Sequence, residues 1–299
     1  MQQNKSEDTA TRGLFTLEPS WRTRGEALAK VVLFLIASTF LFSTAMRTFK
    51  PKLNLTPQGS ILGFLHFQWI HVLYAVLIPV ALLLFVFREP IQFAGVGRRI
   101  RWKQLGFGFL VGVVLIAAVI SVLFLLGDYA HGPLLLSPAQ ILGYGAVYVV
   151  TMLLVALSEE GVFRGYALVQ FSRGISFWPA AIVSSVLFGL GHAANGGMTS
   201  VGVCSVILAG MMLSYAFRRT GAVYFGVGFH AAWDGGTTFL FGAVAVGLRL
   251  PNTLFQAKIT GPAWLTGASA GPIGGALGFA AFLIAAGIVH VCYKPVSTS

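Results

Sequence analysis

The amino-acid sequence predicts an all-α polytopic membrane protein, with about eight transmembrane helices in one bundle. The chain has 299 residues, of which 56% are hydrophobic and only 10% are charged, whereas soluble domains carry about 25% charged residues. Its 36 glycines are typical of helices that pack closely in lipid. The apolar residues also fall into runs of membrane-spanning length, because about 20 helical residues cross a bilayer.

Eight such runs follow one another along the chain. They cover approximately residues 27–46, 66–87, 105–127, 139–157, 177–191, 199–217, 221–244 and 272–293. The polar head, residues 1–25, is expected to be a flexible cytosolic segment, and residues 26–295 a single transmembrane domain. The connection 245–271 is rich in Pro and Gly and is expected to be a loop on one membrane face.

Basic residues set the expected orientation of these helices. With the N-terminus inside, 15 of the 20 Lys and Arg residues fall in cytosolic segments, and the outside segments hold the other five, which include Arg249 and Lys258. An excess of Lys and Arg marks the cytosolic side of a membrane protein. Both termini are therefore expected in the cytosol, and the expected location is the bacterial inner membrane.

The net charge of +11 does not indicate nucleic acid. The basic residues lie between apolar runs, where they set topology. The stretch Gly97–Lys103, GRRIRWK, is expected to anchor the chain to the lipids of the inner leaflet. Membrane lipid is therefore an expected partner, and nucleic acid is not.

A small set of charged and titratable side chains lies at or within membrane depth. A charge near the bilayer centre costs at least about 2.5–3 kcal/mol, so these residues are candidates for a functional site. The set consists of Glu159, Glu160, Arg164, His192, His230 and Asp234.

Helical spacing separates the roles of the two neighbouring glutamates. Glu160 and Arg164 are four residues apart and can pair on one helix face, so an arginine fork is expected to hold Glu160. Glu159 is rotated by about 100° from Glu160, which leaves it free to accept a proton as a general base. The segments Phe188–His192 and His230–Asp234 each place two side chains on one face, which predicts a site between helices.

The three motifs EExxxR, FxxxH and HxxxD, in this order on successive hydrophobic runs, resemble the CAAX protease and bacteriocin-processing family of intramembrane endopeptidases. Here they read Glu159-Glu160-Gly-Val-Phe-Arg164, Phe188-Gly-Leu-Gly-His192 and His230-Ala-Ala-Trp-Asp234. The family-like core is expected at about residues 139–244. The resemblance implies an eight-helix membrane fold and metal-independent proteolysis by a glutamate-activated water, with no cofactor.

The same resemblance implies a role for each residue. Glu159 would activate the water and His192 would help to bind it. Glu160 and Arg164 would hold the arrangement, while His230 and Asp234 would stabilise the oxyanion. The implied partner is a protein or peptide substrate that enters from the membrane or the cytosolic side, through a polar cavity open to the cytosol.

The last position of the resembling motif is Asn or Asp, and Asp234 departs from the CAAX-processing members, which look to have Asn there. An ionised aspartate cannot donate a hydrogen bond to an oxyanion. Burial could keep Asp234 protonated, or Asp234 could orient His230. As a third possibility, Asp234 could bind a metal together with Glu159, His192 and His230, although the chain has no HExxH motif.

Two other functions remain open for these residues. The first is a proton-coupled transporter, in which intramembrane acids and histidines form a relay. The second is a proteolytically inactive family member that acts as a binding or immunity protein. In addition, Glu160–Arg164 could be a purely structural ion pair. The stretch GASAG, Gly267–Gly271, has the spelling of a nucleophile elbow but no preceding strand.

Overall fold

The computed structural model describes residues 24–34, 36, 61–72, 77–88, 95 and 100–293. In this part of the chain the fold is helical, as predicted, and two short antiparallel strands form its only sheet. Most of the predicted flexible segment, residues 1–25, and most of the predicted span 27–46 lie outside the described residues, although residues 24 and 25 are described and helical.

The described helices and strands include at least one helix in each predicted apolar run from the third run onward. They are α3 (Ile61–Val72), α4 (Ile78–Ala81), η2 (Leu82–Val86), α5 (Trp102–Leu125), β1 (Tyr129–Ala130), α6 (Pro138–Glu160), η4 (Gly161–Ala167), α7 (Leu168–Ile175), α8 (Phe177–His192), α9 (Ser200–Thr220), α10 (Tyr224–Gly235), η5 (Gly236–Leu240), β2 (Lys258–Ile259), α11 (Ala263–Thr266), η6 (Ala268–Ala270), η7 (Pro272–Gly274) and α12 (Ala276–Cys292).

Three of the described helical segments are long and apolar enough to cross a membrane. They are Trp102–Leu125, Pro138–Ile175 and Ser200–Thr220, of which the second runs through α6, η4 and α7 without a break. Helices α8 and α12 are also apolar but have 16 and 17 residues. These helices make the chain an integral membrane protein.

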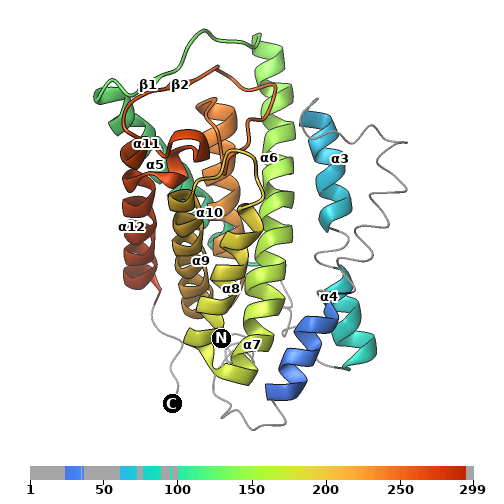
Figure 1. Cartoon of the computed structure of the whole chain (residues 1–299). Helices are drawn as coiled ribbons and strands as arrows, with labels where there is room; N and C mark the ends of the chain where they lie inside the picture. The colour runs from blue at the N-terminus through green and yellow to red at the C-terminus, as the bar shows by residue number, and fades with distance from the viewer. Residues whose placement is uncertain are drawn as a thin grey trace.

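Helix α10 lies at the centre of the bundle, between α5, α6 and α9 (Figure 1). Glycines allow its backbone to touch that of α5. A Cβ atom added at Gly228 would lie 2.0 Å from the carbonyl oxygen of Leu105, and one added at Gly108 would lie 2.1 Å from that of Phe225. The two helices therefore fit together only because both positions lack a side chain.

The two ends of the bundle differ in charge. At the end that we call the basic end, α5 begins, α7 meets α8, and α9 meets α10 (Figure 1). Arg101 ties two of these helices together, since its Nη1 atom donates to the carbonyl oxygen of Thr220 over 2.8 Å. The described basic residues at this end include Arg24, which lies next to Gly174, and Arg101, Lys103, Arg173, Arg218 and Arg219.

At the opposite end, which we call the loop end, the connections after α5 and η5 lie over the helices (Figure 1). The hydroxyl of Tyr129 donates to the carbonyl oxygen of Phe241 over 2.7 Å, and that of Tyr148 donates to Pro251 over 2.7 Å. Burial raises the pKa of Tyr129 to about 12, so its hydroxyl stays protonated as a donor. These bonds fix the loop after η5 to the ends of α5 and α6.

Candidate active site

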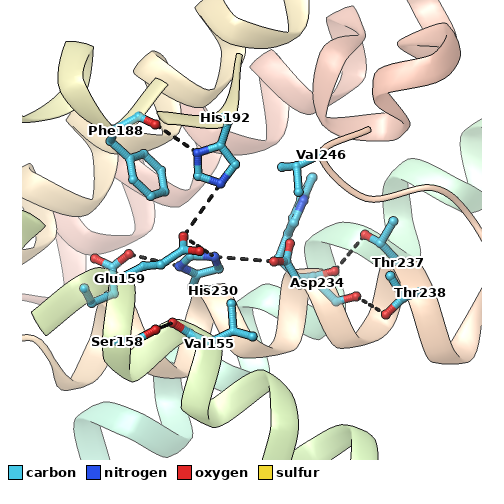
Figure 2. Close-up of polar contacts among 12 residues, drawn as sticks. Val155, Ser158, Glu159, Phe188, His192, His230, Asp234, Thr237, Thr238 and Val246 are labelled. Carbon is cyan, nitrogen blue, oxygen red and sulfur yellow. Dashed lines mark hydrogen bonds and ion pairs between the residues drawn. The ribbon is translucent and has the colours of Figure 1, made fainter. Parts of the chain in front are cut away.

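The structure brings all six predicted site residues together. Figure 2 shows four of them, Glu159, His192, His230 and Asp234. Each motif supplies one wall of the site. The EExxxR motif lies at the end of α6 and in η4, FxxxH lies in the last part of α8, and HxxxD lies on α10.

Glu160 is the buried member of the glutamate pair, with an exposed fraction of 1%. Its Oε1 atom lies 3.0 Å from Nη1 of Arg164 and also 3.0 Å from Nδ1 of His230. The predicted pairing of Glu160 with Arg164 is therefore observed, but through a single nitrogen instead of a fork. The guanidinium carbon lies 4.1 Å above the ring of Phe188, a cation–π contact.

Glu159 faces the other way and is 20% exposed. Its Oε2 atom lies 3.7 Å from Nε2 of His192 and 3.7 Å from Nε2 of His230. These distances exceed that of a direct hydrogen bond, and Oε2 has no hydrogen-bond partner among the described residues. The two neighbouring carboxylates thus have different surroundings, as helical geometry predicts.

The helix changes its geometry where the EExxxR motif lies. Helix α6 ends at Glu160, and η4 continues as a π-helical segment before α7 resumes α-helical geometry. Such segments are rare and often occur at functional sites. This change has no signal in the sequence, because the spacing of the motif residues also fits a regular α-helix.

The FxxxH motif sets the hydrogen-bonding state of His192. Its Nδ1 atom lies 2.9 Å from the carbonyl oxygen of Phe188, and a carbonyl only accepts. Nδ1 therefore carries the proton, and Nε2, which faces Glu159, is an acceptor when the ring is neutral. The Phe188 ring also packs edge-on against the rings of His192 and His230, so it supports both histidines.

Asp234 lies beside His230 on the next turn of α10. Its Oδ2 atom is 3.4 Å from Nε2 of His230, which favours the possibility that Asp234 orients that ring. The hydroxyl of Thr238 donates to the main-chain oxygen of Asp234 over 2.6 Å. Among the described residues, no group of three or more His, Cys, Asp or Glu side chains has the arrangement of a metal site.

The site combines three carboxylates with one guanidinium and two imidazoles. Charges that are buried in a protein require partners of opposite sign. Glu159, Glu160 and Asp234 together carry three negative charges when ionised, and Arg164 balances only one of them. The arrangement is therefore neutral only when imidazoles or carboxylates hold additional protons, which is a suitable starting point for proton transfer.

A cavity of about 780 Å³ adjoins the site. Glu159, His192 and Asp234 form its inner wall, and it continues along α6 past Val155 and Met152. Helix α3 contributes Phe64, Phe67 and Gln68, and the loop after η5 contributes residues 245–250. The amide oxygen of Gln68 is buried there without a hydrogen-bond partner among the described residues.

The part that residues 245–250 play in the cavity was not predicted from the sequence, from which we expected only a loop on one membrane face. Ala245 and Leu248 form an antiparallel bridge around a tight turn, in which Val246 and Gly247 have φ angles of 43° and 80°. The side-chain amide of Asn195 donates to the carbonyl oxygen of Val246 over 2.9 Å. Val246 thereby reaches the site beside Asp234 and His192 (Figure 2). Gly247 was the only local signal of a turn in the sequence.

The GASAG stretch does not form a nucleophile elbow. It follows α11 and forms the 3₁₀ turn η6 between Gly267 and Gly271, whereas an elbow joins a strand to a helix. It does not line the cavity next to Glu159.

Comparison with known proteins identifies the segment that carries the motifs. A family model described as "type II CAAX prenyl endopeptidase Rce1-like" matches residues 141–236. This match includes all six candidate site residues and confirms the family resemblance of the motifs. No curated protein and no solved structure matched the chain.

Proposed function

We propose that this chain, whose residues 141–236 place it with the Rce1-like family, is an intramembrane endopeptidase. It hydrolyses a peptide bond of a membrane-associated protein or peptide with a water molecule that Glu159 activates. The main support is the position of the Glu159 carboxylate, which lies at the cavity wall, 3.7 Å from the Nε2 atoms of both His192 and His230.

A separation of 3.7 Å is too long for a direct hydrogen bond and suits a bridging water. Such a water donates one hydrogen to Glu159 and the other to Nε2 of His192, which is an acceptor because Nδ1 donates to Phe188. Its lone pair then points at the substrate carbonyl. Glu159 takes the first proton as the new C–O bond forms.

The developing oxyanion requires a donor on the opposite side of the carbonyl. His230 supplies it from Nε2 when that nitrogen is protonated, while Nδ1 donates to Glu160 and keeps the ring in place. Collapse of the intermediate breaks the C–N bond, and Glu159 returns its proton to the leaving amine. Glu160 and Arg164 act as positioning residues because they hold His230.

The cavity suits an extended peptide with apolar side chains. Phe64, Phe67, Met152 and Val155 offer apolar contacts along its length. The unpaired amide oxygen of Gln68 accepts a main-chain N–H of the bound peptide, because a buried acceptor without a partner costs free energy that binding recovers.

The Glu159→Gln variant tests the proposal. The change keeps the shape of the side chain and removes the base, so cleavage is expected to fall at least about 100-fold while the protein accumulates normally. Newly formed protein termini are compared by mass spectrometry in membranes from cells with the wild-type chain or the variant. The matched control is Glu26→Gln, an exposed glutamate outside the cavity.

Termini that form equally with Glu159→Gln would contradict the proposed role. If the wild-type chain produces no new termini at all, the inactive binding protein becomes the better assignment. Once a cleaved peptide is identified, the assay is repeated with a chelator. Loss of cleavage that added metal restores would favour metal-bound water over the carboxylate mechanism.

A further inference from the structure

The cavity extends from the site mainly toward the loop end, since Phe163 and Phe188, next to the site residues, are its lining residues on the other side. Helix α6 begins at the loop end, so Val155 and Met152 lie between Glu159 and that end. Asn195, which follows α8, and residues 245–250 also belong to the loop end and line the cavity. The lining residues beyond the site therefore lead toward the loop end.

In the opposite direction the bundle is closed. Helix α8 has 16 residues, so His192 lies roughly 22 Å from its start at the basic end. The side chains that fill this depth are fully buried. They include Tyr166, Leu168, Ala180, Ala181 and Ser184, each with an exposed fraction of 0%.

Charge identifies the side of the membrane to which each end belongs. Arg24, Arg101, Lys103, Arg173, Arg218 and Arg219 are among the described basic residues of the basic end, whereas Arg249 and Lys258 lie at the loop end. The side with more Lys and Arg in short connections is the cytosolic side. The basic end therefore faces the cytosol and the loop end faces outward.

Two expectations from the sequence disagree about the side on which this cavity opens. One was a cavity open to the cytosol, and the other was an outside position for the connection 245–271. Because residues 245–250 line the cavity, a single opening cannot satisfy both. The charge difference between the two ends supports the second expectation.

We propose that the substrate reaches the site from the loop end, on the face opposite the cytosol. The substrate class is then a peptide segment that is exported or that emerges on the outer side of the membrane, and not a cytosolic lipidated tail. That a substrate enters the cavity rests on the proposed function, whereas the direction of access rests on the geometry of the cavity and on the charges at the two ends.

Single cysteines test the direction of access without any known substrate. The background carries Cys204→Ser and Cys292→Ser, which remove both native thiols. Gly196→Cys places a thiol in the cavity wall, where an added Cβ has no atom within 4 Å. Lys103→Cys, on an exposed residue of the basic end, is the matched control.

Intact cells are treated with a membrane-impermeant maleimide before and after permeabilisation. We expect at least about 80% of the final labelling of Gly196→Cys in intact cells, since an open cavity admits the reagent, whereas Lys103→Cys should label only after permeabilisation. The reverse pattern would overturn the proposal. Labelling of Gly196→Cys that requires permeabilisation, or that does not occur, would also overturn it.

An activity measurement distinguishes failure of the proposed access route from failure of the proposed protease function. The same reagent, added to intact cells, should stop formation of the termini that depend on Glu159 in Gly196→Cys but not in Lys103→Cys. If no terminus depends on Glu159, the protease assignment fails, while the labelling pattern still decides which face opens. If termini do depend on Glu159 and the outside reagent leaves them unchanged in labelled Gly196→Cys, access from the loop end is wrong.

Discussion

One oxygen of Glu160 contacts both Arg164 and His230 at 3.0 Å, and this arrangement frees the neighbouring glutamate for chemistry. A guanidinium and an imidazole held by the same carboxylate fix the position of the His230 ring. Glu159 then faces the cavity with an oxygen that no described side chain occupies. In the proposed mechanism, Glu160 thus positions His230, and Glu159 transfers the proton.

At the same scale, Asp234 permits a sharp test because the resemblance implies Asn at this position in CAAX-processing members. An asparagine oxygen can still face Nε2 of His230, while its amide group donates to the oxyanion. We expect Asp234→Asn to retain cleavage within about 10-fold of wild type, and Asp234→Leu, which removes the polar contact, to lose at least about 100-fold. The rate of formation of the Glu159-dependent termini measures both.

A loss in Asp234→Asn as large as that in Asp234→Leu would show that the negative charge itself is required. In that case Asp234 would act by orienting a charged His230, and an Asn at this position could not replace it.

At the scale of the elements, close contact between α5 and α10 determines where His230 and Asp234 lie. The glycines at 108 and 228 bring the two backbones together, and His230 follows Gly228 by two residues. Glycine at such contacts is typical of membrane helices, where packing replaces the hydrophobic effect. The position of one wall of the site therefore depends on a helix that carries no motif.

Gly228→Ala is expected to disrupt this contact. Its new Cβ would lie 2.0 Å from the carbonyl oxygen of Leu105 and 2.8 Å from the nitrogen of Phe109, so the backbones must separate. We expect a loss of about 1–3 kcal/mol or more of stability and a marked loss of cleavage, because His230 moves with the helix. Thermal unfolding in detergent measures the first effect.

The control is Gly106→Ala on α5, where an added Cβ has no neighbour within 4 Å. That change should leave the unfolding temperature unchanged or raise it slightly, since alanine favours a helix by about 1 kcal/mol over glycine. Equal effects of the two substitutions would show that helix propensity, and not the contact, explains the loss.

Sequence reasoning predicted six residues that the structure brings together, but not the other elements that line the cavity beside them. Helical spacing was sufficient to place Glu159 and Glu160 in different surroundings, because both lie on one local element. It could not find the π-helical segment after Glu160 or the turn at Val246, since long-range packing determines both. Gln68 was also missed, because its position in the cavity wall depends on how α3 packs against α6.

For the whole molecule, the cavity open toward one end argues against the transporter alternative. Toward the basic end, the hydroxyl of Ser172 donates to Leu168 of its own helix and that of Ser184 donates to Phe163 of η4, so both of these protons are held by main-chain oxygens. A proton relay requires groups that pass protons from one to the next across the full depth of the membrane.

We therefore expect proteoliposomes that contain the purified chain to show no proton flux above that of protein-free vesicles. An imposed pH gradient, followed with a dye trapped inside, provides the measurement, and an added ionophore shows that the vesicles are sealed. Faster decay of the gradient with the wild-type chain than with Glu159→Gln would support the relay.

The ion pair within the EExxxR motif also affects how the nascent chain enters the bilayer. Glu160 and Arg164 leave the ribosome almost together, whereas His230 follows Glu160 by 70 residues, which is a delay of roughly 4–14 s at translation speeds of about 5–20 residues per second. During this interval the glutamate already has a counterion from its own helix. The ion pair therefore lowers the cost of keeping this charged segment in the insertion machinery until the helices that will surround it have been made.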